Sequence, residues 1–305
     1  MKLYVDFDTI IYRYAISLQK TTVEVSYKDN GVTKVFKNIT EFRGRNKKEP
    51  GGWFGDVNVF FNSNFLLKDC NINKKTKIIL KDNVAHKHIT AYVEELKQDF
   101  EEVKIIVGGN NNYRYKIFPN YKKDRGEKPL RLLQVKDWTI NNLENVVVAD
   151  GCEADDYCSI IGWWAYRNKK DDVVIGGCDK DLLQIPGKHW NYDKREEGII
   201  EVDIFTAHHN LCKQLLLGDV TDGIKGLPLT TSEICDKYNI KQGGVGKIKT
   251  EQILSNINTI EGLYRAVEEC YKSYYKEEWK SALNQTYQLV KLMEKKGVIP
   301  TYEFS

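Results

Sequence analysis

The chain alternates short apolar runs with longer amphipathic segments. Apolar, β-rich runs lie at residues 2–7, 77–80, 103–107, 146–149 and 173–176. The stretches 88–100 and 154–167 carry apolar residues at helical spacing, and each of them precedes one of these runs. This β-α-β rhythm predicts an α/β fold with a Rossmann-like parallel sheet covered by helices.

A second pattern interrupts this rhythm near the N-terminus. Between residues 21 and 37, apolar and polar residues alternate on both sides of Asp29-Asn30-Gly31. Asn-Gly favours the positive φ angles of a tight hairpin turn, so we expect an inserted β-hairpin over about residues 20–52. Its last part, 42–52, is rich in Lys and Arg, for which a solvated surface loop is favoured over a nucleic-acid contact.

The β-rich character fades after about residue 205. The rest of the chain consists of helix-like and loop-like segments, including a long helix-like stretch at 250–275. This change predicts two domains, which are an α/β core at 1–204 and a helical part at 205–305.

Length and composition limit the class of protein. At 305 residues the chain can bury a core without crosslinks. Its seven cysteines, with no Cys-x-x-Cys pair, are typical of reduced thiols in a cytosol. Because no window has the ~20 apolar residues of a membrane span and the N-terminus lacks a signal peptide's apolar stretch, we expect a soluble, cytoplasmic protein. A net charge of +3 does not by itself indicate a nucleic-acid partner.

Acidic residues gather where strands or loops are predicted to end. They form four clusters: Asp6 and Asp8; Glu153, Asp155 and Asp156; Asp179 and Asp181; Asp219 and Asp222. The carboxyl ends of parallel strands form ligand sites, so these clusters are expected to converge. Packed carboxylates repel one another, and divalent cations such as Mg²⁺ would neutralise them. Singly, an acidic first helical turn or an N-cap explains a cluster as well; together the four favour a two-metal site.

Six motifs resemble, in this order along the chain, the 5′ nuclease family. They are YVDFD (4–8), FPNYKKDR (118–125), CEADD (152–156), CDKDLLQI (178–185), LGDVTDGIKGLP (217–228) and GGVGKIKTEQIL (243–254). The family includes flap endonucleases, the 5′-nuclease domains of bacterial DNA polymerases and phage 5′→3′ exonucleases, and the wording is most similar to the phage branch. The resemblance implies a metal-dependent 5′→3′ exonuclease or flap endonuclease that hydrolyses DNA from 5′ ends, with RNA in an RNA–DNA hybrid as a further substrate.

The resemblance also assigns roles to the acidic residues. It implies that one metal ion is bound by Asp6, Glu153, Asp155 and Asp156. A second ion would be bound at or near Asp179, Asp181, Asp219 and Asp222. The ions would be two Mg²⁺, for which Mn²⁺ can substitute, and Asp6 and Asp155 would be catalytic residues.

A basic motif would act on the substrate beside these carboxylates. Tyr121, Lys122 and Arg125 match the family's motif at the foot of an arch, which would be short here and lie within about residues 118–138. Lys122 and Arg125 are implied to stabilise charge on the scissile phosphate, whereas a solvated basic helix face is the alternative for them. Arg114 matches a further contact to DNA phosphate.

The glycine-rich motif would bind the duplex away from the cut. It resembles the second hairpin of a helix–three-turn–helix motif, whose backbone carbonyls would also bind K⁺. The residues implied to contact DNA are Gly244, Gly246, Lys247 and Lys249, with Gly243 beside them. An insertion at 227–242 separates this hairpin from the preceding motif, so the loop is expected to be remodelled.

One departure from the family concerns the carboxylates. Relatives carry an aspartate just after the strand at 103–107, where this chain has Gly108 and Gly109, and Asn110, Asn111 or Asn112 could hold a metal-bound water instead. Asp8 lies outside the usual pattern and is expected to be at most an outer-shell helper. The loss leaves an alternative function, a catalytically weak protein of the same fold that binds DNA junctions.

Two other nuclease classes fit less well. A 3′→5′ exonuclease needs Asp-x-Glu on its first strand, and Asp6-Phe7-Asp8 lacks the glutamate. PIN-type ribonucleases usually lack the glycine-rich hairpin. If the chain comes from a phage, as the resemblance suggests, its location would be the host cytoplasm. The sequence does not indicate which protein partners it has.

Overall fold

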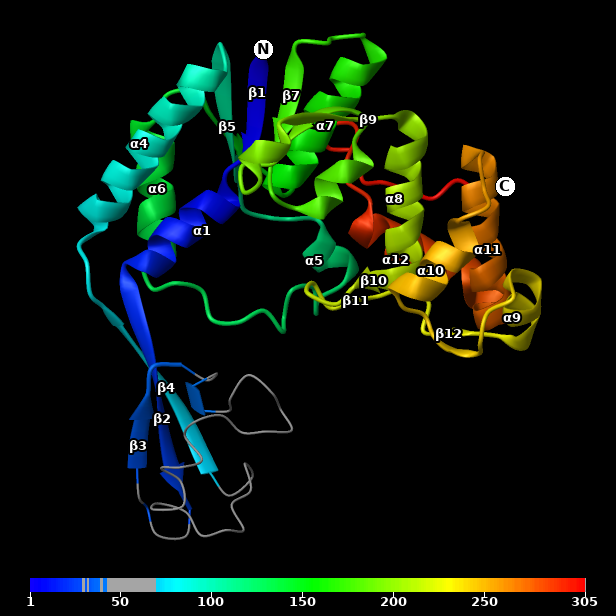
Figure 1. Ribbon diagram of the computed structural model, residues 1–305, viewed down its shortest axis with the longest axis horizontal. Coiled ribbons are helices and arrows are strands. Elements are labelled where there is room, and N and C mark those ends of the chain that lie inside the picture. Colours follow the sequence, from blue (N-terminus) through cyan, green and yellow to red (C-terminus); the bar gives the residue numbers. More distant parts are fainter. Residues whose placement is uncertain (29–30, 32, 39–40, 43–69, 305) are drawn as a thin grey trace. The chain divides into compact units, whose positions relative to one another are not determined.

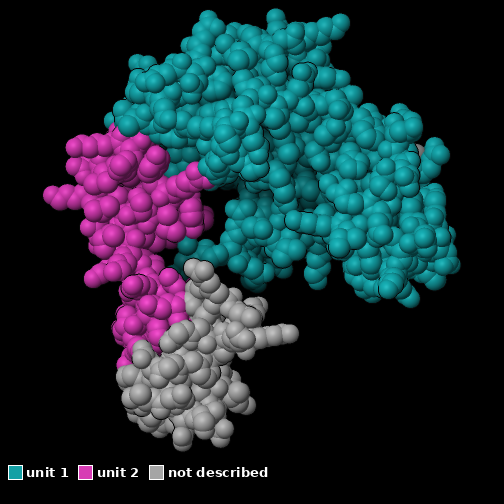
Figure 2. Space-filling view, in the orientation of Figure 1, with its two compact units in different colours: residues 1–10, 90–127, 139–305 teal, residues 11–89, 128–138 magenta. Residues whose placement is uncertain are grey.

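The computed structural model describes residues 1–28, 31, 33–38, 41–42 and 70–304. The chain divides into two compact units, coloured separately in Figure 2. Unit 1 comprises Met1–Ile10, Thr90–Glu127 and Thr139–Ser305, and unit 2 comprises Ile11–Ile89 and Lys128–Trp138. Residues on both sides of 205 lie in unit 1, so the predicted division of the chain at that point stays a prediction.

A six-stranded sheet forms the centre of unit 1 (Figure 1). Its strands, in spatial order, are β6 (Val146–Ala149), β5 (Glu102–Gly108), β1 (Lys2–Asp6), β7 (Val173–Gly176), β8 (Gly187–Trp190) and β9 (Ile199–Val202). All neighbours are parallel except β8 and β9, which are antiparallel. The predicted α/β fold with a central parallel sheet is confirmed, because a continuous apolar run such as β7 suits a strand covered on both faces.

Helices alternate with the strands of this sheet along the chain. Unit 1 contains α5 (Arg114–Ile117), α7 (Ala154–Arg167) and the short helices η2 (Lys180–Gln184) and η3 (Arg195–Glu197). Three further helices have residues in both units: α1 (Asp8–Ser17), α4 (Asp82–Asp99) and α6 (Leu132–Asn142). Helix α7 packs against β1, β5 and β7. It comes very close to the chain after β7, since a Cβ on Gly162 would lie 2.3 Å from Cγ2 of Ile185. The predicted helix at 154–167 is confirmed.

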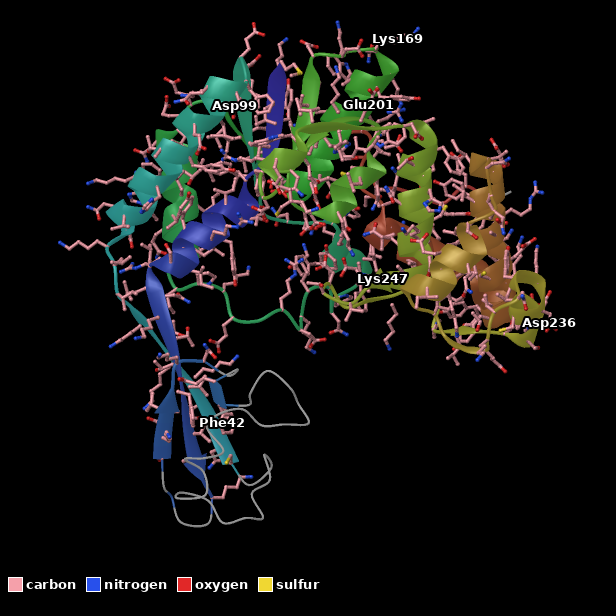
Figure 3. The ribbon with its side chains drawn as sticks, in the orientation of Figure 1. Phe42, Asp99, Lys169, Glu201, Asp236 and Lys247 are labelled. Carbon is pink, nitrogen blue, oxygen red and sulfur yellow. The ribbon has the colours of Figure 1, made fainter. Side chains whose placement is uncertain are left out.

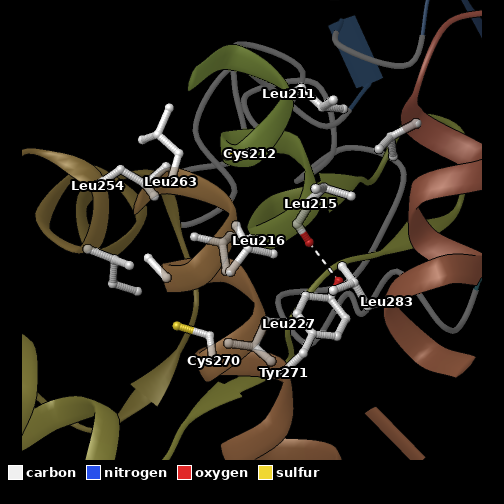
Figure 4. Packing of buried hydrophobic residues seen from close by; sticks show 14 of the residues in the cluster. Leu211, Cys212, Leu215, Leu216, Leu227, Leu254, Leu263, Cys270, Tyr271 and Leu283 are labelled. Atoms are coloured by element: carbon white, nitrogen blue, oxygen red, sulfur yellow. Dashed lines mark hydrogen bonds between the residues drawn. The ribbon is translucent and has the colours of Figure 1, made fainter. Parts of the chain in front are cut away.

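The C-terminal part of unit 1 is helical, as predicted. It contains α8 (Ile204–Leu217), α9 (Ser232–Tyr238), α10 (Lys247–Leu254), α11 (Ile260–Tyr275), η4 (Lys276–Glu278) and α12 (Trp279–Val290). Two short antiparallel pairs lie among them: β10 (Gly218–Asp219) with β11 (Ile224–Lys225), and β12 (Leu229–Thr230) with β13 (Gly243–Gly244). Figure 4 shows the hydrophobic core that the C-terminal helices share, where the Tyr271 hydroxyl donates to the Leu215 carbonyl at 2.7 Å. Tyr121 is buried in the same core.

Unit 2 contains a three-stranded antiparallel sheet of β3 (Thr33–Phe36), β2 (Gln19–Tyr27) and β4 (Cys70–Ile78), in that order. Val23 and Val25 of β2 are buried, as alternation predicts, and β2 pairs with β3 as the inserted hairpin. The hairpin turn at Asp29-Asn30 and the basic residues 43–52 lie outside the described residues.

The apolar run at 77–80 does not belong to the parallel sheet. Its first residues end β4, which pairs with β2 in unit 2, so the predicted place of this run in the β-α-β rhythm is wrong. The physical reason is that β4 begins as a polar, mostly exposed strand, which a doubly covered parallel sheet would not accommodate.

Two further features bear on the predictions. Between residues 119 and 131 the chain forms turns and coil, and helix begins only at Leu132, so the predicted arch at 118–138 has little helix in it. Within the part of the chain that the structure describes, no helix has the length and apolar character that crossing a bilayer requires.

Candidate functional site

The carboxyl ends of three parallel strands carry three of the four predicted acidic clusters. Asp6 ends β1, Glu153 stands between β6 and α7, and Asp179 follows β7 and caps η2 by accepting the Asp181 N–H at 2.9 Å. Asp6 experiences the charges of Asp8, Asp179 and Glu153. The structure therefore brings together the clusters that follow β1, β6 and β7.

The fourth cluster joins them through side chains. Asp219 influences Asp181 electrostatically, and the Tyr121 hydroxyl lies 2.7 Å from Glu153 Oε2 and 2.9 Å from Asp222 Oδ2. Asp219 holds its own loop by accepting the N–H of Thr221 at 2.8 Å.

Several of these carboxylates are crowded by like charge. Burial and the carboxylates of Asp8, Asp179 and Glu153 raise the pKa of Asp6 to about 8. Burial and the carboxylate of Asp179 raise the pKa of Asp181 to about 6. Burial, Glu153 and Asp156 raise the pKa of Asp155 well above its ordinary range. Such shifts mean that the folded chain opposes full ionisation of this cluster.

Lys122 and Arg125 neutralise the negative charge of other carboxylates in the cluster. Lys122 forms an ion pair with Glu153, and its Nζ lies 3.6 Å from Asp222 Oδ2. The Arg125 Nε donates to Asp222 Oδ1 at 3.0 Å. Burial alone would raise the pKa of Glu153, but Lys122 and Arg114 outweigh it and lower that pKa. The predicted basic motif therefore lies directly against two of the predicted ligands.

The backbone at Lys122 is held in an unusual conformation. Its φ is +59°, in the left-handed region that non-glycine residues rarely adopt. The Lys122 N–H donates to the carbonyl of Asp222 at 3.0 Å. The preceding residue, Tyr121, is buried in the C-terminal core. These contacts stabilise the turn, and strain of this kind is concentrated at functional sites.

Asp156 and Arg114 form a buried pair under the site. Arg114 Nη1 and Nη2 donate to the two oxygens of Asp156 at 2.6 and 2.9 Å, and Nε donates to the Leu289 carbonyl at 2.8 Å. Asp156 also accepts the N–H groups of Glu153 and Met293. The predicted roles of Asp156 in metal binding and of Arg114 in phosphate contact compete with these bonds, and both stay predictions.

The glycine-rich hairpin lies on β13 and the start of α10. Gly243 has a φ of +137°, and its N–H and carbonyl both bond to Oγ1 of Thr230, at 3.2 and 3.1 Å. Gly246 precedes α10, and Lys247, labelled in Figure 3, is exposed at the first position of that helix. Free backbone groups at a helix start and exposed lysines are suited to phosphate contact.

Oxygen ligands at this sheet edge fit a hard divalent cation. Oδ1 of Asp181 is buried without a hydrogen-bond partner, and the crowded carboxylates of Asp6 and Asp155 would be neutralised by a bound ion. Within the described residues, no three acidic, His or Cys side chains already enclose such an ion. Glu153 and Asp222 instead point to Lys122 and Arg125, so ion binding would require these two carboxylates to exchange partners.

Sequence reasoning missed two features of this site. It treated Asp8 as an outlier, although the carboxylate of Asp8 accepts the Gly108 N–H at 3.1 Å at the same sheet edge. It also missed the C-terminal segment, which supplies the Leu289 carbonyl and the Met293 N–H under the site. The Asp-x-Asp spacing after the first strand was the available signal for Asp8; no local signal indicated the second feature.

Comparison with known proteins gives consistent sequence matches. Residues 60–209 match the family model described as "5'-3' exonuclease, N-terminal resolvase-like domain". A 5′-3′ exonuclease of Halalkalibacterium halodurans is 25% identical over 247 residues, which cover 76% of this chain and 68% of that protein. DNA polymerase I of Streptococcus pneumoniae is 22% identical over 219 residues, and the match spans 64% of this chain but only 23% of the polymerase.

Two solved structures of bacteriophage T5 proteins show similarity at low TM-scores. A T5 5′-exonuclease with bound zinc has a TM-score of 0.37 and 14% identity, covering 67% of this chain and 91% of that one. A T5 flap endonuclease in complex with DNA and metal ions has a TM-score of 0.34 and 14% identity, covering 66% and 89%. The family model and the sequence relatives support a member of the 5′ nuclease family, with the enzyme class of a 5′–3′ exonuclease or structure-specific nuclease.

Proposed function

We propose that this nuclease is a metal-dependent 5′→3′ exonuclease and flap endonuclease that hydrolyses DNA near a free 5′ end by a two-metal mechanism. The observation that carries the proposal is the convergence of crowded carboxylates, among them Asp6, Asp155 and Asp181, at one edge of a parallel sheet. Such a cluster is costly without cations, and two divalent ions would relieve it.

The oxygen-only ligand set favours Mg²⁺, with Mn²⁺ as a substitute. Asp6, Glu153 and Asp155 would hold one ion, and Asp179, Asp181, Asp219 and Asp222 would hold or surround the other. Asp156 would help chiefly by orienting its neighbours, because Arg114 and two backbone N–H groups already bind it. When bound, the ions supply a hydroxide nucleophile near neutral pH and neutralise charge on the scissile phosphate.

Lys122 and Arg125 would move from carboxylates to phosphate. Lys122 forms an ion pair with the predicted ligand Glu153. Arg125 forms an ion pair with the predicted ligand Asp222. With Glu153 and Asp222 serving as metal ligands, Lys122 and Arg125 would be released to donate charge-assisted hydrogen bonds to the scissile phosphate. The same side chains would thus hold the ligands in place before the ions and substrate arrive.

The glycine-rich hairpin would hold the duplex at a distance from the cut. Backbone groups of Gly244 and Gly246, together with Lys247 and Lys249, would contact phosphates, and K⁺ would bind nearby backbone carbonyls. Phosphate contacts carry no base sequence, so recognition would depend on the structure of the 5′ end. RNA in an RNA–DNA hybrid is a further substrate under this proposal.

The alternative is a junction-binding protein of the same fold with weak catalysis. Gly108 and Gly109 favour it, because they stand where the resemblance to the family implies a carboxylate. Under this alternative the protein would bind 5′ flaps and nicks as tightly as a nuclease but would turn over negligibly in Mg²⁺.

Cleavage of labelled duplexes separates the two functions. A 5′-flap duplex and a nicked duplex, labelled at the 3′ end of the candidate strand, would be incubated with Mg²⁺, Mn²⁺ or EDTA. We expect shortening from the 5′ side with either ion and none in EDTA. Tight binding without cutting in both ions would contradict the nuclease proposal and support the junction-binding protein.

A further inference from the structure

Asp8 and Gly108 meet at the ends of adjacent strands. Asp8 begins α1 two residues after β1, and Gly108 ends β5 beside it. The Gly108 N–H lies 3.2 and 3.1 Å from the two carboxylate oxygens of Asp8. The backbone of one strand end therefore holds the carboxylate that follows the other.

Asp8 also fills the space that a side chain at position 108 would need. A Cβ on Gly108 would lie 2.5 Å from Oδ2 of Asp8, and the nearest atom outside Asp8 is the nitrogen of Ala154 at 3.6 Å. The obstruction is thus the end of one side chain and not the backbone. If Asp8 were shortened, position 108 would have room for a side chain.

The neighbouring glycine offers no such room. A Cβ on Gly109 would lie 2.5 Å from the Ala149 carbonyl oxygen and 2.8 Å from Cα of Asp150, both backbone atoms. Position 109 therefore cannot carry a carboxylate without moving β6. Of the two glycines, only position 108 has its side-chain space facing the acidic cluster, and Asp8 occupies it.

The Asp8 carboxylate acts on the rest of the cluster. The Asp8 N–H donates to Oδ1 of Asp6 at 3.1 Å, which fixes the two aspartates relative to each other. The charge of Asp8 also acts on Asp6 and on buried Cys158. Holding a further carboxylate this close to Asp6 raises the repulsion that a cation would relieve.

We propose that Asp8 supplies to the metal site the carboxylate that position 108 lacks, so that Asp8 and Gly108 form a compensated pair. This inference rests on the proposed function, because it assigns one more ligand, direct or through water, to the same site. The Asp8 carboxylate then requires glycine at position 108, because any side chain there would occupy the same space. The glycine does not mean that the site has lost a carboxylate. The chain retains a full set of carboxylates, with one of them contributed from α1.

Metal binding without DNA tests the pair directly. Mn²⁺ affinity of the full chain would be measured by the electron paramagnetic resonance signal of free Mn²⁺, which needs no activity. Asp8→Asn keeps the size of the side chain and removes its charge, and we expect Mn²⁺ to bind at least about tenfold more weakly. Asp150→Asn is the matched control, because Asp150 is exposed near the same sheet edge, and it should leave the affinity unchanged.

A double variant tests whether the two positions are equivalent. Asp8→Ala should weaken Mn²⁺ binding, and adding Gly108→Asp to it should restore most of the lost affinity, since the new side chain begins where the Asp8 carboxylate was. Gly108→Asp alone places two carboxylates in one space and should lower thermal stability. Circular dichroism of each variant would show that it is folded before affinities are compared.

The outcomes separate this inference from the proposed function. Wild-type affinity in Asp8→Asn would overturn the inference, as would a folded double variant that binds Mn²⁺ no better than Asp8→Ala. If the double variant fails to fold, Asp8→Asn alone decides. Absence of Mn²⁺ binding by the wild type would contradict the metal site itself, whereas loss in Asp155→Asn with full binding in Asp8→Asn would contradict only the role of Asp8.

Discussion

The guanidinium of Arg114 binds both oxygens of the Asp156 carboxylate, at 2.6 and 2.9 Å, and neither residue has more than 1% of its surface exposed. This pair joins the start of α7 to the C-terminal segment, because Asp156 also accepts the Met293 N–H at 3.0 Å. Asp155 is its direct neighbour, so the pair positions a predicted metal ligand from beneath.

Breaking the Arg114–Asp156 pair should destabilise the fold. Arg114→Met leaves a buried carboxylate without its counter-charge, which typically costs about 3–5 kcal/mol of unfolding free energy. Urea denaturation would measure the loss, and the double variant Arg114→Met with Asp156→Leu should lose much less, because no charge is left unpaired. A stability close to that of the wild type in Arg114→Met would show that Asp156 does not depend on Arg114, and would favour the predicted phosphate contact.

Asp155→Asn should separate cutting from binding. The substitution removes a carboxylate whose pKa is raised by burial and by Glu153 and Asp156, while its Oδ1 can still accept the Asp156 N–H. We expect cleavage of the flap duplex to be lost and affinity for it in EDTA to be kept, with thermal stability in EDTA equal or higher because repulsion is relieved. Residual cleavage at the wild-type rate would exclude Asp155 from the metal site.

Lys122→Ala should slow the chemical step. If the ammonium stabilises charge on the phosphate, the single-turnover rate should fall by about 10²–10³-fold. Mn²⁺ affinity should not fall, because Lys122 neutralises Glu153 and does not bind the ion. Lys123→Ala, an exposed neighbour of equal charge, is the control, and an equal loss in both variants would point to general charge.

Lys247→Ala should weaken DNA binding in a way that depends on salt. Lys247 is exposed at the start of α10 beside the glycine-rich hairpin. Loss of one phosphate contact should lower the slope of log affinity against log salt by about 1, regardless of base sequence. Titration of a fluorescent duplex at several salt concentrations would measure it, with exposed Lys241→Ala for comparison; equal slopes in all three proteins would exclude the contact.

His189 should make stability depend on pH. Burial lowers the pKa of His189, whose Nε2 lies 2.7 Å from the Ile185 carbonyl, although that bond acts in the opposite direction. The contribution of neutral His189 to the free energy of unfolding is complete above the unfolded pKa of about 6.5. It is lost as pH falls below that value, by at most about 1.4 kcal/mol per pH unit.

Comparison with His189→Gln isolates this contribution, since other buried groups titrate in the same range. Urea denaturation between about pH 7.5 and about pH 5.5 should show a smaller loss of stability in the variant. Parallel pH dependence of the two proteins would mean that His189 titrates alike in the folded and unfolded chain.

Local sequence patterns predicted much of the fold. The runs that became β1, β5, β6 and β7 are short and apolar, and they alternate with amphipathic segments, which is sufficient to indicate a parallel sheet with helices. That topology in turn placed Asp6, Glu153 and Asp179 at one sheet edge, because parallel strands end on the same side. The inserted hairpin was predictable for the same reason, since alternation and an Asn-Gly turn are local features.

What a side chain contacts was decided only by the tertiary structure. The run at 77–80 looked like a core strand, but the polar residues before it pair with β2. Arg114 and Asp156 each carried a motif-based role, yet 42 residues of separation hide that they bind each other. Asp8 and Gly108 lie 100 residues apart, and only the pairing of β1 with β5 brings the carboxylate of one into the side-chain space of the other. Residue type and local periodicity are written in the sequence, whereas strand register and packing decide which charges meet.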